Sequence, residues 1–160
     1  MKVGIILLFV FQVLNSQGQD TLSLNSLDTT ISLNPYLSYY LDEDKSKGIG
    51  SIANLSSGYF IPLDARGLRL PKTESQIWLK LNLKNELPEK EEFIIEFIDP
   101  SLYVIDLYRP QSDGLYKVFT SGTHASQDKK AVKGNKNNFI LKLDPDKEVS
   151  IFLKIHSTSN

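Results

Sequence analysis

Residues 74–85, ESQIWLKLNLKN, alternate apolar and polar side chains over most of their length. The side chains of a strand point alternately to its two sides, so the segment predicts a strand with one buried face. The residues on that face are Ile77, Leu79, Leu81 and Leu83. Trp78, the only tryptophan of the chain, falls on the opposite face beside Lys80, where a large aromatic ring needs its own explanation.

The same alternation returns at short intervals between turn signals, which predicts many short strands and no long amphipathic helix. We expect LPEKEE to turn the chain back after residues 77–83, PQSDG to join a hairpin, and DPDKE to join a closing hairpin of residues 139–143 and 149–155. The fold class is therefore all-β, a jelly-roll-like antiparallel β-sandwich. The other expected elements are strands at 36–41, 58–63, 92–98, 103–109 and 115–119 and a helical turn at 49–55.

Sorting the expected strands by parity gives one shared apolar face. Fully burying each such side chain stabilises the fold by ~1.5–3 kcal/mol. The chain has no cysteine, so this core must hold the domain together without disulfides. The predicted core comprises Ile77, Leu79, Leu81, Leu83, Phe93, Ile95, Phe97, Ile105, Leu107, Phe139, Leu141, Leu143, Val149, Ile151, Leu153 and Ile155.

The N-terminus predicts export. Lys2 precedes an apolar run at residues 3–14, and small residues follow, as in a secretory signal peptide at residues 1–18. A membrane anchor is the alternative, but the run is shorter than the ~20 residues that span a bilayer. We expect a leader at 19–34, a sandwich domain at 35–157, and the start of a C-terminal continuation at 158–160. The protein would then be periplasmic, extracellular or secreted.

The net charge of −1 argues against nucleic acid as a partner, because nucleic-acid binders carry a basic excess. No GxSxG motif occurs, and the two histidines, His124 and His156, lack a metal-binding spacing. Asp42 and Asp44 are spaced like the start of a calcium loop, but Ala53 stands where that loop needs a glutamate. We therefore expect no enzyme, no cofactor and no metal site.

The second face of the strands mixes aromatic rings with charged groups. This mixture suits a ligand such as a saccharide, because the apolar faces of a sugar ring stack on aromatic residues and its hydroxyl groups need polar partners. This face comprises Trp78, Lys80, Ile94, Glu96, Ile98, Asp106, Tyr108, Phe152, Lys154 and His156. The candidate ligand-binding residues are Trp78, Lys80, Asp106, Tyr108, Lys154 and His156. In the alternative interpretation, residues 42–58 or 120–136 fold over this face, and Trp78 packs in a satellite core with its indole N–H bonded to the backbone.

Four segments in order, YYLDEDKSKG, IWLKLNLKN, FIIEFIDPSLYVIDLYRP and VSIFLKIHS, resemble the type 2 extracellular domain of the seven-transmembrane receptors with diverse intracellular signalling modules (7TMR-DISM). The family's Leu-Glu-Asp-Pro, Trp-Leu-Arg, Val-Asp-Leu-Tyr-like and Tyr-Leu-Arg motifs correspond to residues 41–44, 78–80, 105–108 and 152–154. Lys80 and Lys154 stand where the family usually has arginine, and the loop after Gly122 lacks its arginine.

The resemblance implies a jelly roll similar to carbohydrate-binding modules that serves as the sensor domain of a bacterial membrane receptor. Its partners would be a small extracellular ligand, for example a saccharide, a membrane-embedded segment and a cytoplasmic signalling module. Because no membrane helix follows the domain within the 160 residues, we expect either a fragment of such a receptor or, alternatively, a free-standing secreted carbohydrate-binding or adhesion module.

Overall fold

The computed structural model describes residues 20–26, 30–63, 70–71, 73–97, 104–122 and 137–156. The expected signal peptide, Ile98, most of the loop at 120–136 and the C-terminal residues 158–160 lie outside these ranges. Within them, no helix has the length and apolar character needed to cross a membrane.

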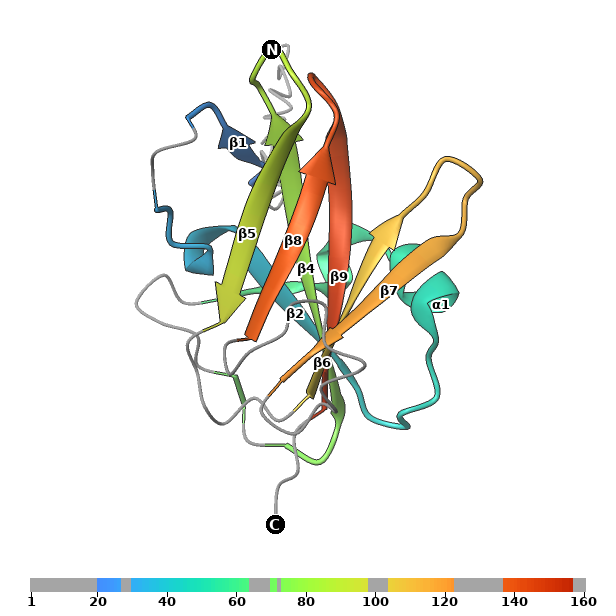
Figure 1. Cartoon of the computed structure of the whole chain (residues 1–160). Coiled ribbons are helices and arrows are strands. Elements are labelled where there is room, and N and C mark those ends of the chain that lie inside the picture. Colours follow the sequence, from blue (N-terminus) through green and yellow to red (C-terminus); the bar gives the residue numbers. More distant parts are fainter. Residues whose placement is uncertain are drawn as a thin grey trace, which may run out of the picture.

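Two β-sheets make up the described structure (Figure 1). The larger sheet has seven strands, ordered β3-β2-β4-β9-β6-β7, with β1 pairing parallel to β4. Its strands are β1 (Leu22–Leu24), β2 (Leu37–Asp42), β3 (Ile61–Pro62), β4 (Gln76–Asn85), β6 (Val104–Pro110), β7 (Tyr116–Ser121) and β9 (Glu148–His156). The smaller sheet pairs β5 (Glu91–Phe97) with β8 (Asn137–Leu143). The helical elements are short: α1 (Ile49–Ala53) and the 3₁₀ helices η1 (Asn34–Tyr36) and η2 (Ser57–Tyr59).

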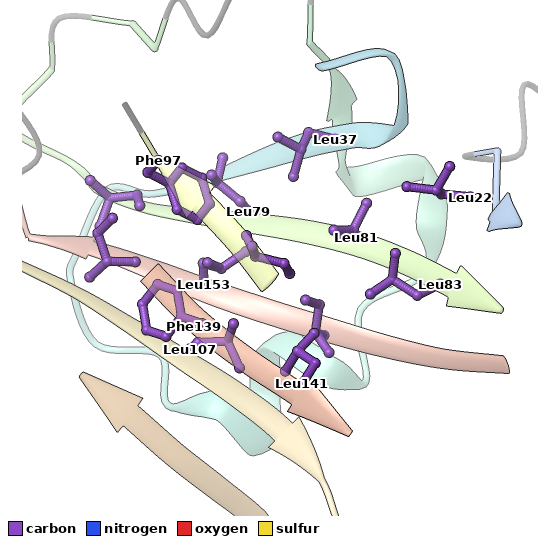
Figure 2. Packing of buried hydrophobic residues seen from close by; sticks show 14 of the residues in the cluster. Leu22, Leu37, Leu79, Leu81, Leu83, Phe97, Leu107, Phe139, Leu141 and Leu153 are labelled. Carbon is purple, nitrogen blue, oxygen red and sulfur yellow. The ribbon is translucent and has the colours of Figure 1, made fainter. Parts of the chain in front are cut away.

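The two sheets pack face to face, and their inward side chains form the main core (Figure 2). Leu79, Leu107 and Leu153 of the large sheet and Leu141 of the small sheet are all fully buried. Every residue of the predicted core belongs to this cluster, with Phe93 and Val149 only partly buried at its margin. The packing of two sheets around this shared core confirms the prediction of an all-β sandwich.

The expected closing hairpin of residues 139–143 and 149–155 is wrong. β8 pairs with β5 in the small sheet, whereas β9 lies between β4 and β6 in the large sheet. The DPDKE segment is a crossover from one sheet to the other, and LPEKEE likewise carries the chain from β4 to β5 without pairing them. A hairpin and a crossover can place the same residues inward, so the alternation did not distinguish them.

Asn85 stabilises both crossovers from the end of β4. Its buried side-chain amide donates hydrogen bonds to the carbonyl oxygens of Glu89 (2.9 Å) and Leu143 (3.1 Å), and its Oδ1 accepts one from Leu87 N–H (3.0 Å). Its backbone carbonyl also accepts from the N–H of Asp146 in the second crossover (2.8 Å). Asn85 therefore links the large sheet to the start of β5 and the end of β8, which pair with each other at one end of the small sheet.

Other expected elements are present with changed limits. The β6–β7 hairpin forms across the predicted turn, with Gly114 at φ +80, a backbone conformation that L side chains rarely adopt. The helical turn at 49–55 is α1, and residues 20–26 contribute the parallel strand β1. The strand expected at 58–63 shrinks to β3, because Ser57–Tyr59 form η2 and the strand ends at Pro62.

Candidate functional site

The outward face of β4, β9 and β6 carries the candidate residues in two rows. Trp78 of β4 is the direct cross-strand partner of Lys154 on β9, and Lys154 is the partner of Asp106 on β6. The next row runs from Lys80 through Phe152 to Tyr108. His156 stands one position further along the same face of β9, opposite Val104. The six candidate residues therefore lie on one face of three adjacent strands.

Ile94 and Glu96 do not belong to this face, although parity grouped them with it. Both lie on β5, whose outward side chains are on the outer surface of the small sheet, and Ile94 pairs there with Ile140 of β8. Parity assigns a side chain to one side of its own strand but not to a particular sheet. Ile98, the remaining member of the grouping, lies outside the described residues.

A segment from α1 to Phe60 covers much of this face. Ile52 and Phe60 pack with Trp78 and Phe152 in a second buried cluster, separate from the main core. Trp78 is 1% exposed, so the alternative interpretation of residues 42–58 as a cover describes its environment. That interpretation also expected the indole N–H to bond to the backbone. Among the described residues, however, this N–H has no hydrogen-bond acceptor.

Aromatic and cationic contacts connect the buried and exposed parts of the face. The rings of Trp78 and Tyr108 lie 5.4 Å apart, and Lys154 Nζ lies 5.6 Å from the Trp78 ring centre. Lys80 Nζ lies 5.4 Å from the ring centre of Phe60. Burial lowers the pKa of Lys80 and, together with the charge of Asp106, raises the pKa of Tyr108. Each of the two cations therefore lies over an aromatic ring, Lys80 over Phe60 and Lys154 over Trp78.

Asp106 and His156 form the polar end of the face. His156 Nε2 is 2.8 Å from Asp106 Oδ2, and the Thr120 hydroxyl donates to Asp106 Oδ1 at 2.6 Å. These hydrogen bonds, that of His156 first, lower the pKa of Asp106, and burial opposes them. The side chain of His156 is 40% exposed and that of Asp106 is 20% exposed. This end therefore offers solvent an ionised carboxylate and an imidazole held in a fixed geometry.

The sequence interpretation omitted Thr120, which completes the row as the partner of Asp106 on β7. The register of the predicted β6–β7 hairpin could have identified Thr120. If the pairing is continued one residue past the expected strand end at 119, position 120 lies opposite position 106. Ile52 and Phe60 were also omitted from the expected core. Neither lies on a long alternating strand, so no periodicity marks them.

The calcium-like spacing at Asp42 has a structural explanation. The fully buried Asp42 carboxylate accepts a hydrogen bond from Lys47 N–H at 2.8 Å and lies 3.5 Å from Lys47 Nζ, which closes the turn between β2 and α1. No group of three or more His, Cys, Asp or Glu side chains suited to a metal ion occurs among the described residues.

The described structure is a two-sheet β-sandwich whose large sheet carries aromatic side chains on its outer face under a short helical cover. A sandwich of this kind can host many different functions, so the fold alone does not assign one. The family model 7TMR-DISM extracellular 2 matches residues 34–160. The chain belongs to this family, which confirms the resemblance of its four segments. No curated protein matches the chain.

Membership places the domain on the periplasmic or extracellular side of the membrane. The family comprises the extracellular sensor domains of seven-transmembrane receptors that are linked to intracellular modules, and these domains are generally non-catalytic. The protein is therefore an extracellular sensor domain of this receptor class.

Proposed function

We propose that the domain binds a small extracellular saccharide at the exposed end of the outer face of the large sheet. The observation that carries the proposal is the row of Trp78, Lys154 and Asp106, with His156 beside it at the edge of the cover. A saccharide hydroxyl can donate to the Asp106 carboxylate and accept from Lys154 or His156. Several directional polar groups beside an apolar surface are the usual composition of a small-molecule site.

Tyr108 and Trp78 contribute from beneath this polar end. The ring of Tyr108 is half-buried against Trp78 and offers an apolar surface next to Asp106 on the same strand. Trp78 acts indirectly, because it supports Tyr108 and Lys154 while it is itself covered. Lys80, further under the cover on Phe60, fixes the position of that segment.

Signalling requires that the bound ligand favour one of two receptor states. We propose that the cover from α1 to Phe60 is the element that differs between them, because it contacts the aromatic rows next to the ligand end. Its short helix buries Ile52 as its only fully buried side chain, so a limited set of contacts holds it. Occupancy would then pass through this element to the membrane-embedded and cytoplasmic modules.

A glycan array followed by titration calorimetry tests this function. The wild-type protein is compared with Asp106→Asn, which removes the carboxylate charge, and with Asp146→Asn, a matched substitution in the β8–β9 crossover. We expect at least one glycan to bind wild type and Asp146→Asn equally, and to bind Asp106→Asn about tenfold more weakly, as for the loss of a charged hydrogen-bond acceptor. A glycan that binds both variants like wild type, or an array without any bound glycan, would contradict the proposed site.

A further inference from the structure

A concave surface lies on the side of the β6–β7 hairpin opposite the candidate saccharide site. Arg109 and Lys117 have the same parity as Leu107 and Phe119, so they point to the core-facing side, beyond the end of the main core. There they meet the edge strand β8 of the small sheet, where Arg109 Nη1 donates to the Lys142 carbonyl at 3.4 Å. The resulting cavity measures about 390 Å³. We call it the cationic cleft, and its lining residues are Glu92, Arg109, Lys117, Phe119, Ile140 and Lys142.

The charges of the cationic cleft are unbalanced. Arg109 and Lys117 are direct cross-strand partners, and like charges in that position repel each other. Both lie over the same ring, with Arg109 Cζ 5.6 Å and Lys117 Nζ 5.1 Å from the centre of Phe119. The aromatic face attracts each cation but does not neutralise it.

The described residues supply one carboxylate to the cationic cleft, and it is already engaged. Glu92 forms an ion pair with Lys142 across β5 and β8. No ion pair within the described ranges involves Arg109 or Lys117. With three cationic side chains and one carboxylate, the formal charge of the lining is +2. Two adjacent cations in a concave, partly apolar surface attract an anion more strongly than isolated surface lysines do.

We propose that the cationic cleft binds a small organic carboxylate. The guanidinium of Arg109 presents paired donors that match a carboxylate, and Lys117 adds a second charge from the neighbouring strand. Phe119 and the partly exposed Ile140 form an apolar wall for the body of the ligand. The bound carboxylate would lie between the two like charges and remove their repulsion. This site is independent of the saccharide site, which lies on the opposite face of the same hairpin.

An NMR titration with the sodium salt of glucuronate tests the proposal, and glucose serves as the matched neutral sugar. We expect glucuronate to shift the backbone amide signals of β6, β7 and β8 at the cationic cleft, and glucose to leave them in place. Raising the salt concentration should weaken the binding, because screening reduces attraction between exposed charges. Amide shifts that are equal for the two sugars, or no shifts at the cleft with glucuronate, would overturn the proposal.

Two further arms make the assignment specific. Lys117→Gln should weaken glucuronate binding about tenfold, the effect of losing one charged hydrogen bond. Lys147→Gln should not change it, because Lys147 in the β8–β9 crossover does not line the cleft. Inorganic phosphate serves as a second anion. Phosphate that binds the cleft as tightly as glucuronate would overturn the assignment to carboxylates, and weaker phosphate binding would support it. Glucuronate effects confined to β4 and β9 would come from the other site and, with the cleft amides unchanged, would overturn this proposal.

Discussion

Lys154 Nζ lies 5.6 Å from the centre of the Trp78 ring, and the two residues are direct partners on adjacent central strands of the large sheet. One side of the indole therefore carries a cation, and other parts of it pack against Ile52, Phe60 and Phe152. The tryptophan that alternation places outside the main core is in fact the largest side chain of a second core.

Replacing Trp78 by alanine should destabilise the domain by ~3–5 kcal/mol, the usual cost of truncating a fully buried large aromatic residue. Urea denaturation measures the change in the free energy of unfolding. Ile94→Ala is the control, because Ile94 is 67% exposed on the small sheet and its truncation should cost little. Equal, small effects of the two substitutions would show that the cover does not hold Trp78 in solution.

Truncating Ile52 to alanine should loosen the cover without removing it. Ile52 is fully buried against Trp78, so the cavity left behind should cost ~2–5 kcal/mol. Because Trp78 is the only tryptophan, its fluorescence reports directly on the cover. We expect faster quenching by acrylamide in Ile52→Ala than in wild type, whereas Leu115→Ala on the exposed β6–β7 turn should quench like wild type.

Asn85→Asp should be strongly destabilising at neutral pH. The substitution replaces an amide donor with a carboxylate oxygen that faces the carbonyl oxygens of Glu89 and Leu143, and each unsatisfied buried group costs about 1–3 kcal/mol. Asn82→Asp on the outward face of the same strand is the matched control. The Oδ1 of Asn82 accepts a hydrogen bond from Ser150, which aspartate retains. A midpoint of urea denaturation that falls equally in both variants would refute the linking role of Asn85.

The pKa of Asp106 should rise when His156 is replaced by phenylalanine, because the hydrogen bond from His156 is the main cause of its lowered value. A lowered folded-state pKa stabilises the fold above the unfolded value of ~3.9 and loses that contribution as pH falls through the folded-state value. Wild type should therefore lose more stability than His156→Phe when the pH falls below about 4. Carbon-13 NMR of side-chain carboxyl groups measures the pKa, with Asp144, held low mainly by Lys90, as an unaffected reference.

Lys117→Glu should stabilise the domain and abolish carboxylate binding at the cationic cleft. The substitution places a carboxylate opposite Arg109 and changes a repulsive cross-strand pair into an attractive one, worth ~0.2–1 kcal/mol. Thermal denaturation and the glucuronate titration measure the two effects. Lys117→Gln removes the charge without reversing it and should give an intermediate stability. A loss of stability in Lys117→Glu would mean that the two cations do not repel each other in the wild-type protein.

Local alternation missed four buried members of the main core: Leu22, Leu24, Leu37 and Leu63. It predicted the part of that core that lies on the longer strands, because the side to which a side chain points depends on its own strand alone. Leu141 and Leu153 are correctly placed inside for this reason. Their strands were wrongly paired, since the choice between a hairpin and a crossover depends on tertiary contacts such as those of Asn85. The same alternation also collected the six candidate residues on one face. It could not show that Trp78 is covered, because the cover depends on the packing of Ile52 and Phe60 from a distant segment without periodicity.

The position of β9 has a mechanical consequence. This last strand is hydrogen-bonded on one side to β4 through eight residue pairs and on the other to β6 through five. A force applied to its His156 end, directed along the strand, shears the hydrogen bonds to β4 and to β6 at the same time. These bonds therefore cannot open one after another, as they can when an edge strand separates from a sheet. Displacement at that end must move the large sheet as a unit.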